Sequence, residues 1–160
     1  MTPISSRQKA GDGVRIGMLT PSSNTVLEPE TQALIAPLGA SASVHFARFR
    51  VTQIGLDAAA DSQFALEPIL AAADLLADAK PAVIAWNGTS ASWRGFDSDD
   101  RLCAEIEART GVPATSAVRA FNGAMAALGV RKLGLVTPYT ADVQQAIARN
   151  YAGIGIEVVA

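Results

Sequence analysis

Short apolar runs alternate with longer amphipathic segments along the 160 residues of the chain. The first run, residues 14–20, is apolar and ends at Pro21 and a polar loop. A short apolar run with such an ending is typical of a buried strand that leads into a helix. By the same pattern, further strands are predicted at residues 43–51, 82–86, 112–115, 133–137 and 156–159. Helices are predicted at residues 26–36, 63–79, 98–110, 118–128 and from Thr140 onward.

The regular alternation of strands and helices predicts the fold class. Strands that are connected through helices form a parallel sheet, with helices packed on both of its faces. Ligands of such sheets bind at the carboxyl ends of the strands, where the loops lead into the helices. We therefore predict an α/β parallel-sheet sandwich with helices on both faces, and we expect functional side chains in the loops that follow the strands.

Capping residues mark several helix ends. Ser98 and Thr140 have short polar side chains of the kind that accepts hydrogen bonds at a helix N-terminus. Gly111 and Gly129 follow the last apolar positions of two helices, where glycine commonly ends a helix. Cys103 falls inside a predicted helix beside apolar residues, so we expect a buried structural thiol rather than a nucleophile.

A segment near the start of the chain is repeated in its second half. Residues 15–21 (RIGMLTP) and 132–138 (KLGLVTP) match position by position in residue character. Two copies of a strand with the same exit turn predict two related lobes. The predicted division is a flexible tail, a first α/β lobe and the start of an incomplete second lobe, at residues 1–13, 14–130 and 131–160. Either the second lobe is truncated, or the natural protein continues beyond Ala160.

Composition narrows the class of partner. The chain is 49% hydrophobic and 18% charged, which is enough to form a core and excludes a disordered or collagen-like class. Its net charge is −2 and its 13 Lys and Arg residues are scattered, so no basic stripe for nucleic acid is expected. No run approaches the ~20 apolar residues that span a bilayer, and one cysteine with one histidine gives no Cys/His metal cluster. We expect a cytoplasmic protein with a small-molecule partner, without nucleic acid, membrane or metal.

The loop at residues 20–25 (TPSSNT) is the first candidate for binding. It lies between a predicted strand and a predicted helix, where free backbone N–H groups favour an anion. The hydroxyls of Ser22 and Ser23 and the amide of Asn24 add further donors. Ordinary helix capping is the alternative, because all three residue types are good caps. The loop has more such residues than capping needs, which favours a binding loop.

Two more polar segments follow predicted strands. In residues 87–90 (NGTS), Gly88 would let a ligand approach the backbone, while Thr89 and Ser90 each offer a hydroxyl and an amide donor. Together with the first loop, this segment predicts a two-sided clamp for a carboxylate. In the repeated exit turn, the phenol of Tyr139 could donate to an oxyanion. The alternative for Tyr139 is a ring packed under the loop with its hydroxyl bonded locally.

These segments resemble a known family. Residues 20–25, followed by Glu28, resemble the opening loop of maleate cis-trans isomerases, and residues 137–139 resemble the mid-chain turn of the same family. Those enzymes belong to the cofactor-independent aspartate/glutamate racemase superfamily. At Gly88 the chain departs from them, because they have a catalytic cysteine there. The sequence Gly-Thr-Ser resembles instead the corresponding loop of arylmalonate decarboxylases.

The resemblance implies roles for the candidate residues. By it, Thr89, Ser90 and Tyr139 form a dioxyanion hole that stabilises an enediolate, and Asn24 holds a carboxylate of the substrate. It implies a small dicarboxylate substrate, maleate-like or malonate-like, and no cofactor. With Gly88 in place of a cysteine, two-base racemisation is disfavoured. The second-lobe cysteine of the family has no counterpart in these residues, so we expect the 160-residue chain alone to be inactive.

Two other functions stay open on the sequence. The first is a non-catalytic relative that binds carboxylates, because fold alone does not establish activity. The second is a flavodoxin-like protein that binds FMN, because residues 20–25 also look like a flavodoxin phosphate loop. Against the second, Pro21 removes one loop amide and the repeated turn has no place in a single-lobe flavodoxin. A homo-oligomer is compatible with the sequence.

Overall fold

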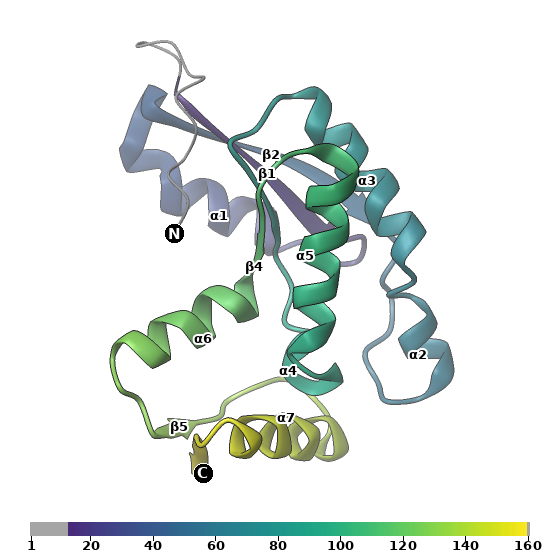
Figure 1. Ribbon diagram of the computed structural model, residues 1–160, viewed down its shortest axis with the longest axis vertical. Helices are drawn as coiled ribbons and strands as arrows, with labels where there is room; N and C mark the ends of the chain where they lie inside the picture. The colour runs from purple at the N-terminus through teal and green to yellow at the C-terminus, as the bar shows by residue number, and fades with distance from the viewer. Residues whose placement is uncertain (1–12, 160) are drawn as a thin grey trace.

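The computed structural model describes residues 13–159, and its main sheet has four strands (Figure 1). The strands lie in the order β2-β1-β3-β4, and every neighbouring pair is parallel. Their bounds are β1 (Val14–Pro21), β2 (Ala42–Phe49), β3 (Val83–Trp86) and β4 (Ala114–Ser116). The predicted parallel sheet is confirmed. The flexible tail predicted for residues 1–13 lies, except for Gly13, outside the described residues.

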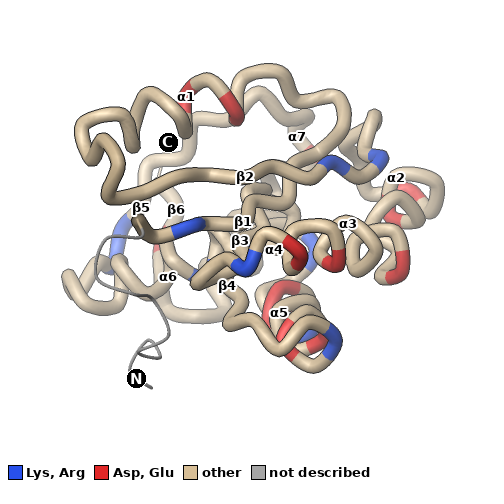
Figure 2. Tube along the Cα trace, turned by 90° about the horizontal axis from the view of Figure 1, so that it is seen from above, with Lys and Arg blue, Asp and Glu red and all other residues tan. Residues whose placement is uncertain are grey.

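Helices cover both faces of this sheet. Figure 2 shows α1 on one side of the strands and α3 and α5 on the other. The bounds are α1 (Leu27–Ile35), α3 (Leu66–Asp78) and α5 (Asp97–Thr110). A 3-10 helix, η1 (Ala36–Ser41), leads from α1 into β2, and α6 (Ala117–Ala127) follows β4. The predicted layers are therefore confirmed.

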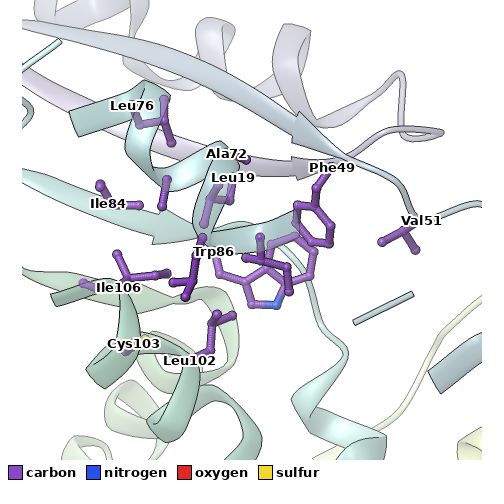
Figure 3. Packing of buried hydrophobic residues seen from close by; sticks show 14 residues of the cluster. Leu19, Phe49, Val51, Ala72, Leu76, Ile84, Trp86, Leu102, Cys103 and Ile106 are labelled. Atoms are coloured by element: carbon purple, nitrogen blue, oxygen red, sulfur yellow. The ribbon is translucent and has the colours of Figure 1, made fainter. Parts of the chain in front are cut away.

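The main core lies between the sheet and the helices α3 and α5. Leu19 of β1, Ile84 of β3 and Ile106 of α5 are fully buried there (Figure 3). Ala73 of α3 is fully buried in the same cluster. Apolar residues recur every three or four positions along α3, so one face of this helix meets the sheet. Each large side chain buried in this way contributes roughly 1.5–3 kcal/mol to stability.

A second, smaller sheet follows in the chain. It consists of β5 (Lys132–Gly134) and β6 (Glu157–Val159), which pair in parallel and are connected through α7 (Ala141–Gly153). A separate apolar cluster surrounds α7 and includes Val143 and Ile147. Trp93 belongs to that cluster and comes from α4 (Ala91–Arg94), which packs on α7. The lobe boundary at residue 130 stays a prediction.

The structure differs from the sequence prediction in four places. The helix expected at 63–79 is α3, but a separate short helix, α2 (Ala58–Ser62), precedes it with Asp57 as its cap and was not predicted. The four-residue helix α4 was not predicted, because one turn is too short to show a period. Ser98 is not a cap: α5 begins one residue earlier, and the Ser98 hydroxyl donates to the carbonyl of Gly95. Strand β5 ends at Gly134, which pairs with Val159 of β6, rather than at Thr137.

Candidate functional site

The loops that follow β1 and β3 lie next to each other at the carboxyl edge of the sheet. The two strands are parallel neighbours, with Leu19 opposite Trp86. Just beyond this pair, the backbone N–H of Asn87 donates to the carbonyl of Leu19 at 3.0 Å. The sheet register therefore brings the loops at residues 20–25 and 87–90 together, as expected for neighbouring parallel strands.

Tyr139 reaches this edge from the turn between β5 and α7. Its hydroxyl lies 2.7 Å from Oγ1 of Thr89, across a separation of 50 residues, and either atom can be the donor. The Tyr139 ring packs edge-on against Trp93, with ring centroids 5.1 Å apart. Two of the three residues predicted to be catalytic are thus in direct contact, and Thr89 is exposed.

The turn that carries Tyr139 is held by Gln144 of α7. The Gln144 amide nitrogen donates to the carbonyl of Tyr139 at 3.1 Å and lies 3.3 Å from the hydroxyl of Thr137. These bonds hold the turn at Thr137 and at Tyr139 itself. Gln144 was not predicted from the sequence, although its position in the first turn of a helix that follows a candidate loop is a signal that could have found it.

Ser90, the third predicted catalytic residue, is buried with 3% of its surface exposed. It precedes the first residue of α4, and its carbonyl accepts from Arg94. Its side chain lines a cavity of about 200 Å³ that also borders Trp86 and Asp99. Within the described part of the chain, no hydrogen bond joins the Ser90 hydroxyl to Thr89 or Tyr139. The structure therefore places Ser90 beside the pair rather than bonded to it.

In the first loop, the two serines bond to the segment that follows β2. The Ser23 hydroxyl donates to the carbonyl of Val51 at 2.6 Å, and the Ser22 hydroxyl accepts from the Val51 N–H at 3.2 Å. Arg48 also donates to the Ser22 carbonyl at 2.9 Å. The loop is therefore tied to β2, and a substrate would compete with Val51 for both hydroxyls.

Asn24 acts at the start of α1. Its side-chain oxygen accepts hydrogen bonds from the N–H groups of Val26 and Leu27, both at 2.9 Å. This capping, which was the alternative interpretation of the loop, fixes the orientation of the amide. Its NH₂ group has no hydrogen-bond partner among residues 13–159, so a donor remains available for a ligand. The binding roles of Asn24, Ser22, Ser23 and Gly88 stay predictions.

Arg48 is a cationic residue that contacts the first loop. It forms an ion pair with Glu28 at 2.8 Å, and both side chains are about one-third exposed. The hydrogen bond to the Glu28 carboxylate raises the pKa of Arg48, which is opposed by desolvation. Because Arg48 also holds the Ser22 carbonyl, it connects the start of α1 with the loop. The contact of Arg48 with the loop was not predicted from the sequence.

Two titratable groups are buried near α5. Burial raises the pKa of Cys103, although the nearby Arg119 opposes this, and the side chain is 1% exposed. The prediction of a buried thiol is confirmed. Burial also raises the pKa of Asp99, against a hydrogen bond from Ser116 that lowers it, and one carboxylate oxygen of Asp99 has no partner. Within the described residues, no group of three or more His, Cys, Asp or Glu side chains could hold a metal ion.

The candidate site thus consists of hydroxyl and amide groups at the carboxyl edge of a parallel α/β sheet. This fold is that of the aspartate/glutamate racemase-like proteins. The chain belongs to the arylmalonate decarboxylase family, whose model matches residues 16–160. Family membership leaves the flavodoxin-like alternative without support. No helix in the described part of the chain combines the length and apolar character needed to cross a membrane.

Solved structures of two kinds of enzyme resemble the chain. Unliganded arylmalonate decarboxylase is 28% identical with a TM-score of 0.66, and the match covers 91% of this chain and 58% of that one. The maleate isomerase Iso from Pseudomonas putida S16 is 25% identical with a TM-score of 0.73, covering 91% and 62%. A Nocardia farcinica maleate cis-trans isomerase bound to TRIS is 25% identical with a TM-score of 0.76, covering 90% and 60%.

The chain is shorter than these relatives. It spans 58% to 62% of the length of the solved structures just described. No curated protein matches it.

Proposed function

We propose that the protein is a cofactor-independent enzyme of the decarboxylase and isomerase type that acts on a small dicarboxylate. The observation that carries the proposal is the 2.7 Å contact between Thr89 Oγ1 and Tyr139 OH. Two hydroxyls this close to each other can both donate to the oxygens of one carboxylate. The family match supports the assignment, because its members are named for a reaction on arylmalonates.

The chemistry follows from where negative charge develops. When one carboxylate of a malonate-like substrate leaves as CO₂, the electrons of the broken C–C bond move onto the remaining carboxylate and form an enediolate. Hydroxyls at Thr89, Ser90 and Tyr139 then donate to its two oxygens. Losing one such donor typically costs about 2.7–4 kcal/mol of transition-state stabilisation, so fixed donors are sufficient to replace a large part of what a metal would supply.

We assign the second carboxylate of the substrate to the first loop. The NH₂ group of Asn24 supplies a donor whose direction is set by the bonds of its oxygen to α1. The backbone N–H of Ser23 adds a donor, whereas that of Ser22 is bonded to the carbonyl of Phe49, and the two hydroxyls are available only in exchange for their bonds with Val51. We assign Gly88 the role of presenting its backbone to the ligand. The start of α1 adds the positive end of a helix dipole.

Gly88 and Cys103 favour a decarboxylase over a two-thiol isomerase or racemase. Gly88 carries no side chain, and Cys103 is buried in the main core, so neither gives this site a thiol. The proposed reaction is therefore C–C bond cleavage with oxyanion stabilisation, completed when an acid of the second lobe delivers a proton to the enediolate carbon from one face, while proton transfer on both faces is disfavoured. A cytoplasmic location and a homo-oligomer stay part of the proposal.

Binding and turnover test this proposal separately. Calorimetry with phenylmalonate and with maleate is expected to show binding that Thr89→Ala weakens at least about 10-fold, because a hydrogen bond to a charged group contributes about 1.5–3 kcal/mol. Thr110→Ala is the matched control. Its hydroxyl is bonded to Ile106 at the end of α5, away from the loops. Turnover is followed on the protein completed by its second lobe, because the 160-residue chain alone is expected to be inactive, by CO₂ release from phenylmalonate and by fumarate formation from maleate.

The outcomes distinguish the proposal from its alternative. Equal affinity in the parent protein and in Thr89→Ala would reject the site. Binding that depends on Thr89 without turnover of either compound would favour the non-catalytic carboxylate-binding relative.

A further inference from the structure

Gly88 lies against the ring of Trp86, two residues earlier in the chain. A Cβ atom added at Gly88 would lie 2.1 Å from Cζ2, 2.5 Å from Cη2 and 2.6 Å from Cε2 of that indole. Distances below 3.0 Å do not occur for real Cβ atoms, so even alanine cannot be accommodated without movement. The position therefore excludes every side chain, including the thiol of a cysteine.

Backbone conformation does not explain this glycine. The described glycines with positive φ are Gly39, Gly95, Gly111, Gly129 and Gly155. Gly88 is not among them, so its backbone is in a region that any L-residue adopts. The requirement for glycine at this position comes from the space that the Trp86 ring occupies.

The ring is also held firmly in place. Trp86 is 2% exposed, and its ring packs against Phe49 with centroids 5.0 Å apart. Its backbone lies in the sheet between Leu19 of β1 and Ser116 of β4. Figure 3 shows the indole among Phe49, Leu19 and Leu102. A rigid aromatic ring with neighbours on these sides cannot yield as the end of a flexible side chain would.

We propose that Trp86 is a specificity-determining residue, which acts by keeping position 88 free of any side chain. It is a positioning residue, because it acts through Gly88 and not on the substrate. With Trp86 in place, the loop after β3 offers hydroxyl and amide donors but no side-chain acid or nucleophile at its glycine. This inference rests on the proposed function for its chemical meaning, but the steric relation between the two residues does not.

Unfolding experiments test the steric relation without any substrate. Gly88→Ala is made in the parent protein and in the variants Trp86→Phe and Trp86→Leu, both of which remove Cζ2 and Cη2, the two atoms of the indole nearest to the added Cβ. We expect Gly88→Ala to lower the folding equilibrium constant more than 100-fold in the parent and less than 10-fold in either Trp86 variant. Gly123→Ala is the control, because nothing lies within 4 Å of a Cβ added there. Its effect should be the same in all three backgrounds.

Thiol labelling adds a second measurement, the reaction rate of a thiol placed at position 88, with and without phenylmalonate. If Trp86 had only a structural role, phenylmalonate would not change this rate. Gly88→Cys in the Trp86→Phe background introduces a thiol at the site, which should react with an aromatic disulfide reagent while buried Cys103 does not. Phenylmalonate should slow that reaction at least 10-fold. Labelling without protection would retain the inference about Trp86 and count against the proposed function.

The inference would be overturned if Gly88→Ala lowered the folding equilibrium constant equally in the parent protein and in the Trp86 variants. If Trp86→Leu does not fold, Trp86→Phe alone decides, since it keeps an aromatic ring against Phe49. A parent protein that tolerates Gly88→Cys with unchanged stability would equally reject the proposal.

Discussion

Removing one oxygen atom, in Tyr139→Phe, is expected to leave the fold almost intact. The Tyr139 hydroxyl has one described partner, Thr89 Oγ1 at 2.7 Å. Thr89 is exposed, so water can replace the lost partner, and the stability cost should lie at the low end of the usual 0.5–1.5 kcal/mol for a hydrogen bond. The edge-on packing against Trp93 is kept, because phenylalanine has the same ring.

The same substitution should have a far larger effect on kcat than on stability. If the hydroxyl donates to an oxygen of the enediolate, its loss removes about 2.7–4 kcal/mol of transition-state stabilisation, which is roughly a 100- to 1000-fold loss of kcat. The expected effect on turnover is therefore several times the effect on folding. This difference in size separates a catalytic donor from a tyrosine that only packs under the loop.

Urea unfolding of the 160-residue chain, and CO₂ release from phenylmalonate by the protein completed by its second lobe, give the two quantities. Tyr151→Phe is the matched control, because Tyr151 is the other tyrosine, is 3% exposed, and has no hydrogen bond to its hydroxyl among residues 13–159. Burial raises the pKa of Tyr151, so its phenol stays neutral in the working range. A loss of less than about 5-fold in Tyr139→Phe, or an equal loss in Tyr151→Phe, would refute the oxyanion role.

Three further predictions concern single side chains. Asn24→Asp keeps an oxygen for the N–H groups of α1 but replaces the amide donor by a negative charge, so calorimetry should show an unchanged or higher Tm with at least about 10-fold weaker binding of phenylmalonate; equal affinity would contradict the role of Asn24. Because burial raises the pKa of Asp99, native stability should fall as the pH rises from the ordinary value of 3.8 through the raised pKa. Asp99→Asn should abolish that fall, and its free energy of unfolding at pH 7 should exceed that of the parent by about 1.4 kcal/mol for each unit by which the pKa of Asp99 is raised. The same pH profile of urea unfolding in Asp99→Asn as in the parent would argue against this prediction. Cys103, whose pKa is raised by burial, should react with thiol reagents only at the rate of unfolding, and faster labelling under native conditions would show an open α5.

The parts of the fold that sequence predicts well have a local physical cause. The start of β1 and its exit follow from an apolar run that ends at a proline, and the ends of α5 and α6 follow from Gly111 and Gly129, which both have positive φ. Strands whose ends depend on pairing with another strand were predicted with shifted bounds, and a helix of a single turn was not predicted. Strand β5 ends at Gly134, before the end of the apolar run, and α4 is a single turn without a period of its own.

In the candidate site, too, features with a local signal in the sequence could be predicted, and features that depend on tertiary packing could not. The loops could be located from the sequence, because small polar residues follow the strands that pattern predicts. Proximity of Thr89 and Tyr139 could be expected only from family resemblance, since no local signal connects residues 50 apart. The contacts of Arg48 with Ser22 and of Trp86 with Gly88 depend on the tertiary packing and were not predictable.

The geometry also shows which donors of the site are available without breaking the fold. Ser22 and Ser23 would have to exchange a bond with Val51 for a bond with the substrate, and such an exchange gains little net free energy. Thr89 and Tyr139 differ, because two hydroxyls carry two hydrogens and their mutual contact uses only one of them. The second hydrogen can point at an oxyanion while the first bond polarises its donor, and such chains of hydrogen bonds strengthen one another. The free site therefore holds one donor ready and a second that becomes available when the two hydroxyls rotate toward a carboxylate, so the pair should respond as a unit. The double variant Thr89→Ala/Tyr139→Phe should then lower kcat by a smaller factor than the product of the factors found in the two single variants.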